Sequence, residues 1–376
     1  MRILHIGYRL PPEPGGKERH IECLTREELA LGHEALIARR HGDVPPGAVE
    51  VALSRTLASR TVARRSDPVA FALECARALP RMGRLDVVNV HGDHREALAI
   101  GPVARRLGIP LVLTVHGALN TRHRQVLRWA FRRIEGFLAL GVRPAADLRA
   151  VGVPASAIRT LSSGLDLPRL DAIRARTAVE EGLIVSVGSL VPVKNHALTI
   201  EAFHRLRAGR PGLRLVIAGE GPERPALERL AQAGPGVELA GHLPREEVTS
   251  LVSRAQVFVL ASRRLPAIGE GVPTAALEAL ALGTAAVLSS DATLDPVVAD
   301  SAAYRVFRSG SAGDLEDQLG AVLDDDVLRA RMAGHGRRAV ADLGWPHVAA
   351  RIVDWYERVR CPVVVGRAAA HQAVGR

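Results

Sequence analysis

The sequence predicts an α/β protein with two similar halves, each built around a parallel β-sheet. The chain has 376 residues, and domains of roughly 100 to 200 residues would make it two. Short runs of β-branched residues alternate with helix-like stretches along almost the whole chain, which is typical of strand–helix–strand units. Two domains imply a cleft between them.

In the first half, each expected strand is followed by a loop and a helix-like stretch. The expected strands cover residues 3–6, 35–38, 87–90, 111–115 and 137–140. The first helix is expected to begin near Lys17 and to end at Gly32, because glycine can adopt the left-handed conformation found at helix ends.

The same pattern restarts in the second half of the chain. Its expected strands cover residues 183–187, 213–218, 237–240, 257–260 and 285–288. The polar stretch 162–182 is expected to be an irregular linker, with the boundary near residue 170. We therefore divide the chain into two Rossmann-like domains, 1–170 and 171–344, a helix at 345–360 and a tail at 361–376.

The helix near the end is expected to be amphipathic. Its apolar positions recur every three to four residues, at Val348, at Ile352 or Val353, and at Tyr356, which is the period of one helix face. Trp345 and Trp355 are expected to anchor the helix to the body of the protein.

The composition indicates a soluble globular protein with an uneven charge. Apolar residues make up 47% of the chain and charged residues 24%. The net charge of +10 lies entirely in residues 1–170, which contain 26 Lys and Arg against 16 Asp and Glu, whereas the rest contains 24 of each. This asymmetry favours an anionic partner for the first half, such as a lipid head group or an acidic glycan. The alternative is that the arginines only form a solvated surface.

Several classes of function and location are disfavoured. Aromatic residues make up only 3% of the chain, so stacking platforms for nucleic acid are scarce. No apolar stretch reaches the roughly 18 residues of a membrane-spanning helix, and the first residues lack the features of a secretory signal. We expect a cytoplasmic protein, with attachment to the inner face of the membrane left open.

Neither a disulfide nor a metal site is expected. The three cysteines, Cys23, Cys75 and Cys361, are widely spaced and are interpreted as unpaired thiols. His91 and His94 follow a strand, but no set of carboxylates and histidines at a convincing spacing completes a metal site.

Ligands of open parallel sheets bind beyond the carboxyl ends of the strands, so the loops there are the candidates. After the first strand, Gly15 and Gly16 allow close approach of the backbone to a ligand at the start of a helix, whose N-terminus attracts anions. Taken alone, they are equally a simple turn. His116 follows the strand at 111–115 and could hydrogen-bond a sugar hydroxyl or a phosphate.

Two loops of the second half add charged groups. Gly188 permits close approach, and Lys194 places an ammonium near the cleft. Pro273 suits the first turn of a helix, with Glu270 before that helix and Glu278 within it. Carboxylates there could accept hydrogen bonds from sugar or ribose hydroxyls. The spacing alone proves nothing, because other glutamate pairs share it, so the context must decide.

Taken in order, these loops resemble the retaining glycosyltransferases of the GT-B architecture, often called glycosyl transferases group 1. The matching segments are PPEPGGKERH, LTVHG, SSGLD, VGSLVPVKNH, EGVPTAALEALALG and WPHVAARIVDWYERV, which together extend over nearly the whole chain. The resemblance implies that the last helix crosses back to the first domain. It also implies a cytoplasmic enzyme of polysaccharide biosynthesis that transfers a hexose-type sugar from a nucleoside-diphosphate sugar.

The resemblance implies roles for individual residues. His116 would lie next to the sugar and Glu270 would bind its hydroxyls; these are the candidate catalytic residues, and no protein nucleophile is expected. The residues implied in donor binding are Gly15, Gly16, Gly188, Ser189, Lys194, His242, Leu243, Gly271, Val272, Leu277 and Glu278. No metal or other cofactor is implied, because Lys194 and the helix dipole would carry the charge of the leaving group.

The sequence departs from the family pattern at Ser189. Family members usually have Gly-Arg-Leu where this chain has Gly188-Ser189-Leu190, so one of two expected cations is missing. Arg263 or Arg264 could substitute for it. Two alternative functions therefore stay open: a protein that binds a nucleotide-sugar without turnover, and a sugar-nucleotide epimerase of the same architecture. A second departure, Ser163 in place of asparagine, is expected to alter a loop and not the chemistry.

The basic stretch 121–136 is the candidate contact for an acceptor or a membrane. Arginines surround Val126, Leu127, Trp129 and Phe131, and a basic helix with exposed aromatic residues can lie on an anionic membrane surface. It is equally plausible that the apolar residues pack into the domain. The candidate residues are Arg122, Arg124, Arg128 and Trp129.

Overall fold

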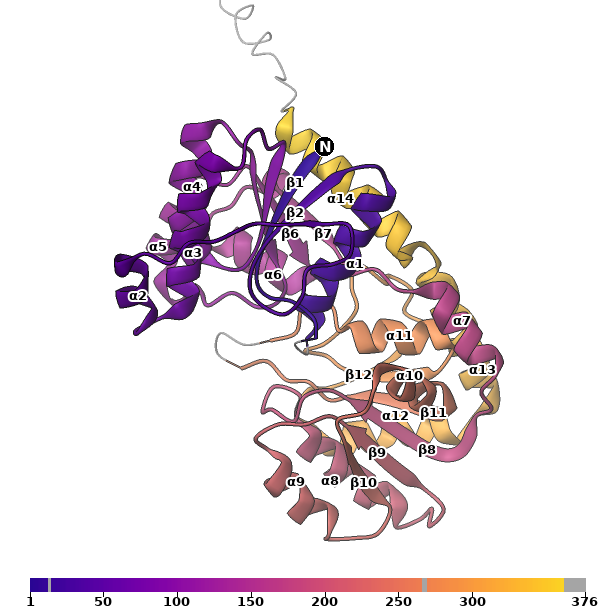
Figure 1. Ribbon diagram of the computed structural model, residues 1–376. Helices are drawn as coiled ribbons and strands as arrows, with labels where there is room; N and C mark the ends of the chain where they lie inside the picture. Colours follow the sequence, from indigo (N-terminus) through magenta and orange to yellow (C-terminus); the bar gives the residue numbers. More distant parts are fainter. Residues whose placement is uncertain (13–14, 266–268, 362–376) are drawn as a thin grey trace, which may run out of the picture.

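The computed structural model describes residues 1–12, 15–265 and 269–361, which form two α/β domains, one above the other in Figure 1. The sheet of the first domain is parallel throughout, in the order β3-β2-β1-β4-β5-β6-β7. Its strands are β1 (Arg2–Arg9), β2 (Glu34–His41), β3 (Val49–Glu50), β4 (Val87–His91), β5 (Leu111–Val115), β6 (Gly136–Leu140) and β7 (Ile158–Leu161).

Helices cover both faces of the first sheet. One face packs against α3 (Asp67–Ala78), α4 (His94–Leu107), α5 (Arg124–Phe131) and α6 (Val142–Ala150). The other face packs against α1 (Gly16–Ala30) and the last helix, α14 (Trp345–Arg360). The short helix α2 (Leu57–Ala63) lies at the edge of the domain, beside α3 (Figure 1). The order of strands reverses between β1 and β4, and ligand sites of doubly wound sheets lie at such a reversal.

The second domain repeats this architecture with a parallel sheet in the order β10-β9-β8-β11-β12-β13. Its strands are β8 (Glu180–Val187), β9 (Arg214–Ala218), β10 (Val237–Gly241), β11 (Ala255–Leu260), β12 (Ala285–Ser289) and β13 (Arg305–Phe307). Its helices are α7 (Leu167–Ala175), α8 (His196–Arg207), α9 (Arg224–Ala231), α10 (Arg245–Arg254), α11 (Thr274–Leu282), α12 (Ala312–Asp324) and α13 (Asp326–Ala339). Here the strand order reverses between β8 and β11.

The expected strands and the first helix are confirmed, whereas three short strands, β3, β7 and β13, were not predicted. The expectation of an irregular linker is wrong, because 162–182 contains α7 and the first residues of β8. Asp166 accepts a hydrogen bond from the backbone N–H of Arg169, which is the usual cap of a helix start. Leu170 and Ile173 are buried in the core of the second domain, so this helix already belongs to that domain.

The last helix crosses back to the first domain, as expected (Figure 1). Val348, Ile352 and Tyr356 are almost completely buried against the first sheet and α1. The chain passes between the domains twice, and the two passages lie side by side. The backbone N–H of Leu165 donates to Leu343 at 2.8 Å, and that of Trp345 donates to Leu165 at 3.0 Å.

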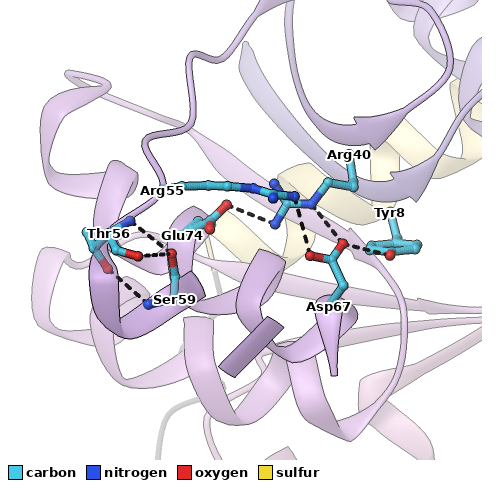
Figure 2. Close-up of polar contacts among 7 residues, drawn as sticks. All are labelled: Tyr8, Arg40, Arg55, Thr56, Ser59, Asp67 and Glu74. Carbon is cyan, nitrogen blue, oxygen red and sulfur yellow. Dashed lines mark hydrogen bonds and ion pairs between the residues drawn. The ribbon is translucent and has the colours of Figure 1, made fainter. Parts of the chain in front are cut away.

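A network of ion pairs ties α3 to the sheet of the first domain (Figure 2). Arg40 of β2 contacts Asp67 at 3.0 Å and Glu74 at 2.9 Å, and the Glu74 side chain is only 1% exposed. The hydroxyl of Tyr8 donates to Asp67 at 2.8 Å. Because a buried carboxylate needs a cation close by, Arg40 stabilises this packing.

Candidate functional site between the two domains

The loop after β11 contacts the ends of two strands of the first domain. The backbone N–H of Val272 donates to the carbonyl of Leu140 at 3.1 Å. At Gly271, a Cβ would lie 2.5 Å from the oxygen of Leu140 and 2.6 Å from that of His116. Only glycine lets the two backbones approach so closely, so the residue type at 271 fixes how the domains meet.

A cavity of about 220 Å³ lies beside this contact and is lined by both domains. Arg143 comes from the start of α6, whereas Arg264, Glu270 and Asp291 come from loops of the second domain. Arg143 is also paired with Asp147 at 3.0 Å. Arg143 was not predicted from the sequence, although it follows a strand at the same edge of the sheet as His116.

Lys194 and Glu270 come together, although 75 residues separate them in the sequence. The Nζ of Lys194 lies 2.5 Å from the carboxylate of Glu270, with the two side chains 20% and 15% exposed. The hydroxyl of Ser262 donates to the same carboxylate oxygen at 2.9 Å. The two charged residues follow β8 and β11, the strands at the reversal of the second sheet, and this is why the fold joins them.

Gly188 leaves room for the Lys194 side chain. A Cβ on Gly188 would lie 3.1 Å from Cε of Lys194, and the φ of Gly188 is positive. The lysine therefore lies over the turn that follows β8.

Glu278 lies on α11 and faces residues of both domains. Arg245 donates to its carboxylate at 3.1 Å. Burial raises the pKa of Glu278, and Arg19 in the first turn of α1 acts in the opposite direction. The beginning of α1 thus faces α11 (Figure 1). The adjacent Leu277 is fully buried in the core, so its side chain is unavailable to a donor.

The glycines at the start of α1 differ in their surroundings. Gly15 precedes the helix with a φ of +156°, and a Cβ there would collide with the Glu18 carboxylate. Gly16 begins the helix, and no atom of the described residues lies within 4 Å of the place of its missing Cβ.

His116 lies at the end of β5, half-buried beside the contact between the domains. Its Nε2 is 3.1 Å from Nδ1 of His91. Burial first, and then the charges of His20 and Lys17, lower the pKa of His116 well below its ordinary value, so its imidazole is uncharged. Among the described residues, others than His116 line the cavity that contains Glu270.

The Ser189 side chain is exposed and brings no charge. Of the two arginines expected to replace the missing cation, Arg263 donates from its guanidinium to the carbonyl of Pro192 at 3.0 Å. Arg264 lines the cavity with Glu270. Arg264 is therefore the better placed substitute.

His242 and Leu243 follow β10 at the edge of the second sheet. His242 is exposed, whereas Leu243 packs against the core. Neither belongs to the cavity that contains Glu270.

The basic helix α5 combines both of the expected arrangements. Leu127 and Phe131 are buried in the domain, whereas Trp129 remains 50% exposed and Val126 45% exposed. The guanidinium of Arg133 stacks on the Trp129 ring at 4.7 Å. The arginines are exposed on the same segment, at Arg122, Arg124 and Arg128.

Two family descriptions match consecutive parts of the chain. Residues 14–169 match Glycosyltransferase Family 4, and residues 171–339 match Glycosyl transferases group 1. The two halves of the chain belong to these two glycosyltransferase families. The protein is therefore an enzyme, and the paired domains described above are its GT-B fold.

Named relatives agree with the assignment to a glycosyltransferase, and a solved structure agrees with the fold. The chain is 28% identical to the glycogen synthase of Mycobacterium tuberculosis, over 95% of this chain and 94% of that protein. It is also 28% identical to the GDP-mannose-dependent alpha-(1-6)-phosphatidylinositol monomannoside mannosyltransferase of Mycolicibacterium smegmatis, over 99% and 100%. The structure of Anabaena Alr3699/HepE in complex with UDP-glucose matches with a TM-score of 0.71 at 14% identity, over 94% of this chain and 98% of that one. Among the described residues, no helix is both long and apolar enough to cross a membrane.

Proposed function

We propose that this glycosyltransferase transfers a hexose from a nucleoside-diphosphate sugar to an acceptor, with retention of the anomeric configuration. The observation that carries the proposal is the contact of Lys194 with Glu270 beside a cavity lined by both domains. A diphosphate needs a cation and a sugar needs hydrogen-bond acceptors, and this pair supplies one of each.

In the absence of a ligand, the two charges neutralise each other. On binding of the donor, the ammonium of Lys194 contacts the diphosphate and the carboxylate of Glu270 contacts the sugar hydroxyls. Glu278 then accepts hydrogen bonds from the ribose, and the N-terminus of α11 adds its positive dipole. Cleavage of the bond between C1 and the diphosphate oxygen leaves negative charge on that oxygen, which Lys194 stabilises.

A thermal-shift screen with UDP- and GDP-sugars identifies the donor, because a ligand that binds only the folded state raises the melting temperature. Glu270→Ala is expected to lower kcat/KM about 10- to 100-fold, since a hydrogen bond to a charged group contributes about 1.5–3 kcal/mol. The matched control is Glu238→Ala, an exposed glutamate on β10, which should retain wild-type activity. Equal activity of the two variants would exclude the proposed role of Glu270.

Ser189 favours a second candidate, a protein that binds the donor without turning it over. If wild-type protein binds a donor tightly but forms no product, and Ser189→Arg restores turnover, this candidate is correct. If wild-type protein is active, Ser189→Arg is expected to raise kcat/KM by about tenfold, because an arginine adds charge-assisted hydrogen bonds. Conversion of the donor sugar without any added acceptor would instead identify an epimerase.

We also propose that the reaction requires no divalent metal, because Lys194 and the N-terminus of α11 carry the charge of the leaving group. Turnover should be the same after treatment with EDTA. Loss of turnover that Mg²⁺ or Mn²⁺ restores would contradict this.

For the acceptor, we propose an anionic or lipid-linked molecule presented at a membrane surface. The support is the excess charge of residues 1–170 and the exposed Trp129 among arginines on α5. Binding to vesicles that contain anionic lipid should weaken in Trp129→Ala and at high salt. Equal binding to neutral vesicles would contradict the electrostatic part of this proposal.

A further inference from the structure

A row of three histidines leads from the site into the first domain and ends at a buried carboxylate. Nε2 of His116 is 3.1 Å from Nδ1 of His91, and Nε2 of His91 is 3.0 Å from Nδ1 of His5. Nε2 of His5 is 2.6 Å from the carboxylate of Glu28. The His5 and Glu28 side chains are 0% exposed, and His91 is 2% exposed.

The row is a product of strand geometry. His5 lies on β1, His91 on β4 and His116 directly after β5, which are three neighbouring strands. Side chains at alternate positions of a strand share one face of the sheet. The rings therefore lie on the face that α1 covers, and α1 supplies Glu28.

While the three rings are neutral, the hydrogen bonds allow two consistent arrangements of protons. A neutral imidazole has one donor and one acceptor nitrogen. If Glu28 is ionised and the rings are neutral, each ring donates from Nε2 toward Glu28. The other nitrogen of His116, Nδ1, is then an acceptor, and it makes no hydrogen bond within the described part of the chain.

One additional proton at the buried end reverses the direction of the hydrogen bonds between the three rings. When either Glu28 or His5 holds it, the ring of His5 donates from Nδ1 to His91. His91 then donates from Nδ1 to His116, whose own Nδ1 now carries hydrogen and becomes a donor. A proton held at the buried end therefore determines whether Nδ1 of His116 donates or accepts a hydrogen bond.

We propose that Glu28, His5 and His91 are positioning residues that set the tautomer of His116, and that the enzyme works in the state in which Nδ1 of His116 accepts a hydrogen bond from a sugar or acceptor hydroxyl. This inference rests on the proposed function. A buried carboxylate is unfavourable unless it is compensated, and Glu28 has His5 at 2.6 Å and the hydroxyl of Tyr356 beside it. No lysine or arginine pairs with this carboxylate among the described residues, so a balancing proton would sit within the row.

Other titratable groups face the same rings. Lys17 and His20 come from α1, and each lowers the pKa of both His91 and His116, after burial. His20 itself has a pKa lowered to about 3 by burial, and its Nδ1 is 2.9 Å from the hydroxyl of Ser163. From α14, Tyr356 lies beside Glu28, and burial raises its pKa well above the ordinary value. These groups are the same in every variant below.

The first test is a spectrum of the wild-type enzyme without donor or acceptor. Two-dimensional 15N NMR of protein labelled at histidine distinguishes Nε2–H from Nδ1–H rings, and single substitutions assign the signals. We expect His5, His91 and His116 to change together in one transition with pH. A change in His5 while His116 keeps its tautomer would overturn the proposal. This measurement needs no turnover, so it remains decisive even if the proposed transfer reaction is not found.

The second test is the pH profile of kcat/KM. Because the working state is the one without the additional proton, activity is lost as the pH falls and the row takes up that proton. Glu28→Gln removes the charge that favours proton uptake. If the NMR spectrum of the variant shows His116 protonated on Nε2, so that the amide oxygen accepts from His5, the acidic limb should move to lower pH by about 1 to 3 units. His5→Gln removes the other residue that can hold the proton, so it should move the acidic limb in the same direction. This variant replaces Glu28→Gln in the test if Glu28→Gln does not fold.

Thr114→Val is the matched control. Thr114 is fully buried on β5 and donates to Asn89 at 2.7 Å. Asn89 in turn donates to Tyr356, which lies beside Glu28, so this branch reaches the buried end of the row while Thr114 itself contacts none of its members. Loss of this hydroxyl should leave the acidic limb in place. A decrease of activity in Glu28→Gln with the limb unmoved, although His116 is still protonated on Nε2, would show that the row is only structural and would overturn the proposal.

Discussion

Gly271→Ala tests whether the approach of the two backbones at the domain contact is required for activity. The new Cβ would meet two carbonyl oxygens, at 2.5 and 2.6 Å, where contacts under 3.0 Å are essentially never found. Both obstacles are backbone atoms at strand ends, so the loop must withdraw and must move Glu270 with it. Overpacking of this kind costs about 1–3 kcal/mol.

The cost falls on the contact between domains and not on either core. If this cost opposes only the contact of the loop with the first domain, kcat/KM should fall about 5- to 150-fold, since 1.4 kcal/mol corresponds to about a factor of ten. The melting temperature should change by less than about 4 °C, because neither core is altered. Steady-state kinetics and calorimetry measure the two effects separately.

Gly313→Ala on α12 is the control, because no atom lies within 4 Å of the place of its missing Cβ. It should match the wild type in kcat/KM and should keep or slightly raise the melting temperature, because alanine favours a helix over glycine. Wild-type kcat/KM in Gly271→Ala would refute the reasoning. A large fall in the melting temperature would show that the strain is taken up inside a domain.

Three further outcomes follow from the packing and the charges. Leu277→Ala should lower the free energy of unfolding by about 2–5 kcal/mol, measured by chemical denaturation, because Leu277 is fully buried; a loss of donor affinity with unchanged stability would contradict this. Arg40→Leu should cost about 3–5 kcal/mol by leaving Glu74 buried without its cation, and adding Glu74→Gln should recover most of that loss, as melting curves can check. Burial raises the pKa of Glu278, so its carboxylate is lost as an acceptor when the pH falls through that raised value; donor affinity should weaken toward acidic pH, and calorimetric titration of Glu278→Gln should show a flatter dependence.

The sequence predicts most of the fold because β-branched runs mark the buried strands of parallel sheets. The ten expected strands are those with long apolar runs, whereas β3, β7 and β13 span only 2, 4 and 3 residues. The helix α7 was missed because the polar surface of residues 162–182 conceals Leu170 and Ile173, which are buried.

For the site, sequence reasoning identifies which loops matter but not which side chains touch. The neighbours Lys194 and Glu270 both lie in expected loops. The histidine row was missed because its members come from four distant segments. A signal was present: polar residues interrupt apolar strands at alternate positions, at Asn89 and His91 and again at Thr114 and His116. The burial of the Leu277 side chain could not be predicted, because position in a helix does not reveal which face is buried.

The crossing of α14 has a consequence for biosynthesis. Ile3, Val87 and Leu138 of the first sheet are covered in part by Val348, Ile352 and Tyr356, which the ribosome adds only after the whole second domain. Until then, a nascent first domain exposes that apolar surface, and such surfaces promote aggregation. Removal of residues 345–360 should therefore impair the solubility of the first domain, although its own strands remain intact.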